Sequence, residues 1–119
     1  MHKFRKLQVW QKAMLFVSSI YAMTKTYPRY EQFGLIDQIR RAAVSVPLNI
    51  AEGSGCGSDK EFVRFLHIAQ RSLYEVITAI EIALQLRYGT KELNNLVISQ
   101  ADELGAMLSG LMKRLKTDS

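Results

Sequence analysis

The sequence of residues 58–87 is SDKEFVRFLHIAQRSLYEVITAIEIALQLR, which combines a helix start with a long apolar repeat. Ser58 and Glu61 have the spacing of a capping box, in which two side chains satisfy backbone amides at the start of a helix. Apolar residues then recur in a heptad-like pattern: Phe62, Phe65, Leu66, Ala69, Leu73, Val76, Ile77, Ile80 and Leu84. The pattern predicts an amphipathic helix to about Arg87, and Gly89 ends it.

Three further helices follow from the same periodicity. The first ends before Pro28, the second covers about residues 35–54, and the fourth covers about residues 90–116. Pro47 removes a backbone donor from the second helix and predicts a kink near residues 44–45. Short turns imply antiparallel neighbours. We therefore predict one domain, residues 1–119, with an all-α fold: an antiparallel up-down-up-down four-helix bundle with a Pro-kinked second helix.

The first helix presents more apolar surface than one neighbouring helix requires. One stripe at helical spacing contains Leu7, Trp10, Met14, Val17, Tyr21 and Thr24. The adjacent stripe contains Val9, Ala13, Phe16, Ile20 and Met23. We assign Val9, Ala13, Phe16 and Ile20 to an interface between copies of the chain. The alternative is that this second stripe belongs to the core of one copy.

The composition is that of a globular domain with a basic balance. The chain has 119 residues and a net charge of +5, and it is long enough to form a core without disulfides. Cys56 is the single cysteine, and no stretch resembles a secretion signal, so we expect a cytoplasmic protein. Apolar runs are far shorter than the roughly 20 residues of a membrane-spanning helix, so we expect no membrane partner.

The motifs that carry chemistry are weak. Residues 53–58, GSGCGS, precede a helix, as phosphate-binding turns do, but they lack the Gly-Lys-Ser/Thr ending and a preceding strand. We favour a plain turn, and a loose phosphate contact stays open. His2 and His67 lie at no metal-ligand spacing from each other or from Cys56. No histidine near Cys56 in sequence would activate its thiol. We predict no catalytic residue, no metal and no cofactor.

Polar residues form a stripe on the second helix that faces others on the third. They are Gln38, Arg41, Ser45, Asn49 and Glu52 on the second helix, and Ser72 and Glu75 on the third. The stripe is either a site or a hydrogen-bond network that fixes how the two helices dock. We favour the structural network, although Glu52 and Glu75 are also of the type used in acid–base catalysis.

One segment of the second helix is characteristic of a known family. Residues 38–53, QIRRAAVSVPLNIAEG, closely resemble the proteins encoded in intervening sequences of bacterial 23S ribosomal RNA genes. Residues 7–13 resemble the opening helix of that family, residues 61–62 and 72–75 resemble its third helix, and nearly the whole chain aligns in length. The resemblance implies a four-helix bundle that assembles as a ring-shaped homopentamer, without catalytic residues.

The accessory variability determinants of diversity-generating retroelements are similar basic pentamers that act with a reverse transcriptase and RNA. A reverse transcriptase is therefore a further implied partner. The turn at residues 55–57, GCG, differs from the basic or polar turn of such relatives, which weakens any role for that turn.

The predicted topology brings the start of helix one, the turn between helices two and three, and the end of helix four to one end of the bundle. Nine basic residues gather there: Lys3, Arg5, Lys6, Lys12, Lys60, Arg64, Lys113, Arg114 and Lys116. The acids at that end are Glu52, Asp59, Glu61 and Asp118, and the other seven basic residues balance the other seven acids. We therefore predict a nucleic-acid-binding pole, where Phe4 and Trp10 would add base stacking if exposed.

Three classes of function follow from these patterns. The leading hypothesis is a non-enzymatic homo-oligomer that binds RNA, either linked to a ribosomal RNA intervening sequence or acting with a reverse transcriptase. The alternative is a protein-interaction scaffold that does not bind nucleic acid. Salt-dependent RNA binding separates these two. An enzyme would need a pocket that the sequence does not reveal.

Overall fold

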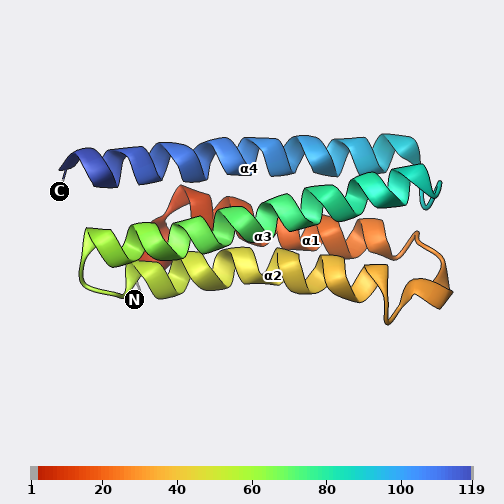
Figure 1. The fold of residues 1–119 in the computed structure, drawn as a ribbon, viewed down its shortest axis with the longest axis horizontal. Coiled ribbons are helices and arrows are strands. Elements are labelled where there is room, and N and C mark those ends of the chain that lie inside the picture. The colour runs from red at the N-terminus through yellow and green to blue at the C-terminus, as the bar shows by residue number, and fades with distance from the viewer. Residues whose placement is uncertain (1–2, 119) are drawn as a thin grey trace.

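The computed structural model describes residues 3–118, with residue 118 described by its backbone alone. Four long helices follow a short 3-10 helix, η1 (Lys3–Lys6): α1 (Gln8–Thr24), α2 (Leu35–Ser54), α3 (Asp59–Gln85) and α4 (Lys91–Asp118). A second 3-10 helix, η2 (Arg29–Glu31), lies between α1 and α2. The helices form an elongated bundle of 46 × 23 × 19 Å (Figure 1). The predicted all-α four-helix bundle is confirmed. Helices α2, α3 and α4 lie within two residues of their expected bounds, and α1 ends at Thr24, before Pro28 as expected.

A side-chain cap fixes the start of α3, and a glycine fixes the turn from α3 to α4. The Ser58 hydroxyl accepts from the backbone N–H of Glu61 at 3.2 Å, which is half of the predicted capping box. The Glu61 carboxylate pairs with Arg64. Gly89 has φ +63°, and a Cβ there would lie 2.7 Å from the Thr26 Oγ1 atom. Glycine therefore allows the tight turn between α3 and α4.

Helix α2 packs closely along α3. Gly53 makes this possible at one end, because a Cβ on it would lie 2.7 Å from the Phe65 Cβ atom and 2.9 Å from the Phe62 ring. The assigned helix continues through Pro47, whose side chain is buried. The kink at residues 44–45 stays a prediction.

The core corrects our assignment of the two stripes of α1. Val9, Ala13, Phe16 and Ile20 are at most 5% exposed and pack in the core of a single copy. The prediction that these four residues form an interface between copies is therefore wrong. The physical reason is that α1 packs against both α2 and α4, and this stripe faces the bundle axis between them.

The other stripe of α1 is the one that reaches the surface. Met14 is 45% exposed and Tyr21 is 38% exposed, and Trp10 and Val17 are half-buried. On α2, Leu48 is 59% exposed. None of the described helices is long and apolar enough to cross a membrane.

Candidate nucleic-acid interface

The structure brings together the three segments that the sequence places at one end of the bundle (Figure 1). Figure 1 shows η1, the turn between α2 and α3, and the end of α4 at the same end of the bundle. The nine predicted basic residues are all exposed: Lys3, Arg5, Lys6, Lys12, Lys60, Arg64, Lys113, Arg114 and Lys116. We call this end the basic pole. The opposite end, formed by the turns at residues 25–34 and 86–90, is the far pole.

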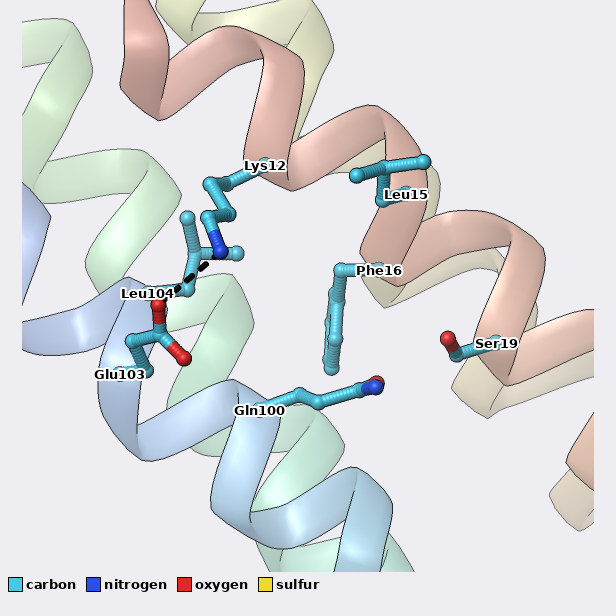
Figure 2. Close-up of a pocket in the computed structure, with 7 residues that line it drawn as sticks. All are labelled: Lys12, Leu15, Phe16, Ser19, Gln100, Glu103 and Leu104. Carbon is cyan, nitrogen blue, oxygen red and sulfur yellow. Dashed lines mark ion pairs between the residues drawn. The ribbon is translucent and has the colours of Figure 1, made fainter.

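Lys12 and Arg64 are each paired with an acid in the described part of the chain. The Lys12 ammonium lies 3.1 Å from the Glu103 carboxylate, an ion pair that joins α1 to α4 (Figure 2). The Arg64 guanidinium lies 2.9 Å from the Glu61 carboxylate and stacks on the Phe65 ring. The hydrogen bond from Arg64 and its charge lower the pKa of Glu61. Lys12 and Arg64 therefore contribute less to the field of the pole than their formal charges. Glu103 is a fifth acid beside the nine cations, so the charge excess at this end is smaller than the sequence count predicts.

The surface of the basic pole is hollowed on two sides. A groove of about 580 Å³ lies between the start of α1 and the end of α4, with Lys6 and Arg114 on its lining. A second hollow lies between η1, the α2–α3 turn and the end of α4, and Lys3 and Ser58 line it. Leu7 and Leu111 line both hollows and separate them. The pole is therefore a concave cationic surface with an apolar floor.

The seam between α1 and α4 continues past the groove. Glu103 lines both the groove and a smaller pocket of about 150 Å³, so the Lys12–Glu103 ion pair stands between the two. Figure 2 shows this pocket, into which the Phe16 ring and the Gln100 amide point. The Gln100 Oε1 atom is buried without a hydrogen-bond partner in the described part of the chain.

The aromatic residues of the basic pole are half-buried. The Phe4 and Trp10 rings meet edge to face, with their centroids 5.1 Å apart. Their mutual packing anchors η1 beside α1. The predicted base stacking on Phe4 and Trp10 therefore has only part of each ring available.

The two side chains near the α2–α3 turn that the sequence offered for chemistry are both exposed. The Cys56 thiol donates to the Glu52 carbonyl oxygen at 3.3 Å and is exposed. His67 is exposed on α3. No group of three or more His, Cys, Asp or Glu residues within residues 3–117 is placed to hold a metal ion. His2 lies outside the described residues.

The predicted polar stripe divides into two parts. The Ser45 and Ser72 hydroxyls are 2.9 Å apart across the α2–α3 seam, and the Asn49 amide donates to the Ser45 carbonyl at 2.8 Å and to its hydroxyl at 3.0 Å. These three residues form the predicted network. The remaining residues assigned to it are exposed: Gln38, Arg41, Glu52 and Glu75. Arg41 pairs instead with Asp37 one turn away, at 2.9 Å. The sequence grouped these four residues with the seam because of their spacing. In the structure they lie on the solvent side of the α2–α3 contact.

The sequence analysis missed the polar network of the far pole. The Tyr27 hydroxyl donates to the Asn94 Oδ1 atom at 2.7 Å, and the Asn94 amide donates to the Tyr88 carbonyl at 2.8 Å. The Tyr88 hydroxyl donates to Glu31 at 2.9 Å, and Glu31 accepts from the backbone N–H of Leu35 at 3.0 Å. One signal was available, because Asn94 occupies a core position of α4 in register with apolar residues.

A second missed contact holds α1 to α2. Arg40 donates to the buried Thr24 hydroxyl at 2.9 Å, and its guanidinium lies 4.5 Å from the centre of the Tyr21 ring. Arg40 therefore helps to hold α1 against α2. The sequence alone indicated only that it is one of the charges away from the basic pole.

Fold and charge together define this chain as a small four-helix bundle with one basic end. Residues 5–110 match the model of the 23S rRNA-intervening sequence protein family, and the chain belongs to that family. The family resemblance seen in residues 38–53 is thus confirmed. The similarity to retroelement accessory proteins stays a prediction. No curated protein matches the chain.

A solved protein structure is similar to this chain over most of the length of both. It is the crystal structure of a protein of unknown function from the S23 ribosomal protein family of Bacteroides thetaiotaomicron VPI-5482, with 24% sequence identity and a TM-score of 0.81. The match covers 88% of this chain and 98% of that chain. It supports the fold.

Proposed function

We propose that this protein is a non-enzymatic homo-oligomer, a pentamer, that binds RNA through its basic pole. The observation that carries the proposal is the gathering of exposed cations from three separated segments at one end of the fold. Cations in such a cluster displace the counterions condensed on a phosphate backbone, which favours binding.

Assembly would multiply this effect. Five copies of a chain with a net charge of +5 would carry +25. When the basic poles point the same way, one RNA contacts several of them, and weak contacts add up to a strong effective affinity.

The test compares two variants that remove the same charge. The pole variant changes Arg5, Lys6, Lys113 and Arg114 to glutamine. The control variant also changes four exposed cations to glutamine: Lys25, Arg29, Arg71 and Lys91. We expect the pole variant to lose RNA binding while the control keeps most of it. The wild type should show a log–log salt dependence with a slope of about 0.7 per single-strand phosphate contact. Equal losses in both variants would contradict a localised site.

The surface stripe of α1 replaces the buried one as our candidate interface between copies. Met14 and Tyr21 of α1 and Leu48 of α2 are exposed apolar side chains, which we assign to this interface, because exposed apolar surface favours association. We expect Met14→Glu with Leu48→Glu to leave a folded monomer, and Phe16→Glu to unfold the chain. Light scattering and circular dichroism distinguish the two results. A wild type that stays at 13.6 kDa would contradict the assembly.

The remaining candidates are outcomes of the same experiments. A wild type that assembles but does not bind RNA would instead be the protein scaffold. Genes beside this one indicate whether the RNA belongs to a ribosomal intervening sequence or to a reverse transcriptase system, because the same surface would serve both.

A further inference from the structure

The groove at the basic pole has the shape and chemistry of a site for one nucleotide. Its apolar lining includes Leu7, Val9, Met107 and Leu111. Its two cations come from different elements, Lys6 from η1 and Arg114 from α4. A base face packs against apolar side chains, and cations beside it hold the adjoining phosphates.

The floor is left open by a small residue of α4. A Cβ atom at Gly110 would have no neighbouring heavy atom within 4 Å, so no part of the bundle occupies that space. The one acid on the lining is Glu103, and its carboxylate is paired with Lys12. The groove therefore repels phosphate less than its lining would indicate.

Base pairing decides which RNA can use this groove. In an A-form duplex the bases are stacked inside and only groove edges and the backbone face a protein, whereas unpaired bases can be turned outward. An unpaired base can place its face on the apolar lining between the two helices, whereas the bases of a duplex are stacked inside it. The exposed Gln8 amide at the rim provides donors and an acceptor for a base edge.

We infer that the groove between the start of α1 and the end of α4 binds an unpaired nucleotide of single-stranded RNA, with Lys6 and Arg114 on its phosphates and its base on Leu7, Met107 and Leu111. This inference rests on the proposed function, since it assigns the RNA class and the place where a base is held. The other cations of the basic pole would contact phosphates of single-stranded and duplex RNA alike.

Filling the groove without changing charge tests the inference. Gly110→Leu places a side chain in the open space, and Ser99→Leu adds a similar side chain on an exposed position of the same helix outside the groove. The probes are a uridine oligomer and a duplex of equal phosphate number. We expect Gly110→Leu to weaken oligomer binding about tenfold, the scale of one lost base contact, and to leave duplex binding unchanged. Ser99→Leu should change neither.

Each other outcome has a defined meaning. An unchanged oligomer affinity, or an equal loss for both probes, overturns the groove site while the basic pole stands. A change in assembled mass with Gly110→Leu makes the groove an interface between copies and also overturns it. If Gly110→Leu does not fold, Ala106→Leu on the same lining is tested in its place. Absence of RNA binding by the wild type refutes the proposed function itself.

Discussion

The two poles of the bundle differ in what their polar side chains contact. At the far pole, Tyr27, Glu31, Tyr88 and Asn94 are hydrogen-bonded to one another or to backbone groups that end helices. At the basic pole, the nine cations are exposed. The side-chain hydrogen bonds of Ser58 and Gln11 there satisfy backbone groups at the start of α3 and in η1. The far pole thus contributes to the stability of the fold, whereas the basic pole leaves its charges exposed at the surface where we propose that RNA binds.

Among the substitutions that compare the two poles, Asn94→Ala should have the largest effect on stability. This change leaves the buried Tyr27 hydroxyl and the Tyr88 carbonyl without their partner, which costs roughly 2–3 kcal/mol. Urea unfolding would measure the loss. Asn95→Ala is the matched control, because Asn95 is exposed on the same turn of α4. Equal stabilities of the two variants would refute a structural role for the far-pole network.

This contrast also explains which parts of the molecule the sequence could predict. Helix bounds were predictable because caps, glycines and apolar spacing are local signals. The basic pole was predictable because antiparallel topology alone brings the three segments together. The Tyr27–Asn94 pair was not, since it joins residues 67 positions apart and depends on how α1 and α4 meet.

The two stripes of α1 show a different limit. Both have helical spacing and both are apolar, so periodicity predicts that the helix is buried on a wide face but not which stripe faces the axis. That choice depends on the positions of α2 and α4, and the structure places Phe16 inside and Met14 outside. Likewise, spacing grouped Arg41 with Ser45, although only Ser45 reaches α3.

The far pole should also make stability depend on alkaline pH. Burial raises the pKa of Tyr27 from 10.0 to about 12. Below pH 10 this tyrosine is protonated in both the folded and the unfolded chain, so its contribution is fully present. As the pH rises from 10 to 12 the unfolded chain ionises first, and roughly 2 kcal/mol of stability is lost.

Tyr27→Phe removes that titration and is the control. Its free energy of unfolding should fall less between pH 10 and 12 than that of the wild type, as measured by urea unfolding. A residual slope is expected from Tyr88, whose pKa is raised by its hydrogen bond to Tyr30, by partial burial and by the Glu31 carboxylate. Parallel pH curves for the two proteins would contradict the burial of Tyr27.

The seam between the poles should give an intermediate effect. Ser72→Ala removes one hydroxyl from the half-buried pair with Ser45, and we expect a loss of about 1 kcal/mol. Arg41→Ala breaks only an exposed ion pair with Asp37, so its effect should stay within about 0.5 kcal/mol. Thermal melts of both variants measure the difference. An Arg41→Ala loss as large as that of Ser72→Ala would restore Arg41 to the network.

The smallest stability effect is expected at the basic pole itself. Changing Arg5, Lys6, Lys113 and Arg114 to glutamine removes exposed charges that repel one another, and it leaves the buried core unchanged. The free energy of unfolding should stay within about 0.5 kcal/mol of the wild type, because substitutions at such surface positions rarely change it more. Urea unfolding at low and high salt provides the measurement. Since the same variant is expected to lose RNA binding, unchanged stability would assign that loss to the surface and not to the fold. A loss of several kcal/mol would instead show that the basic pole, like the far pole, is part of what holds the bundle together.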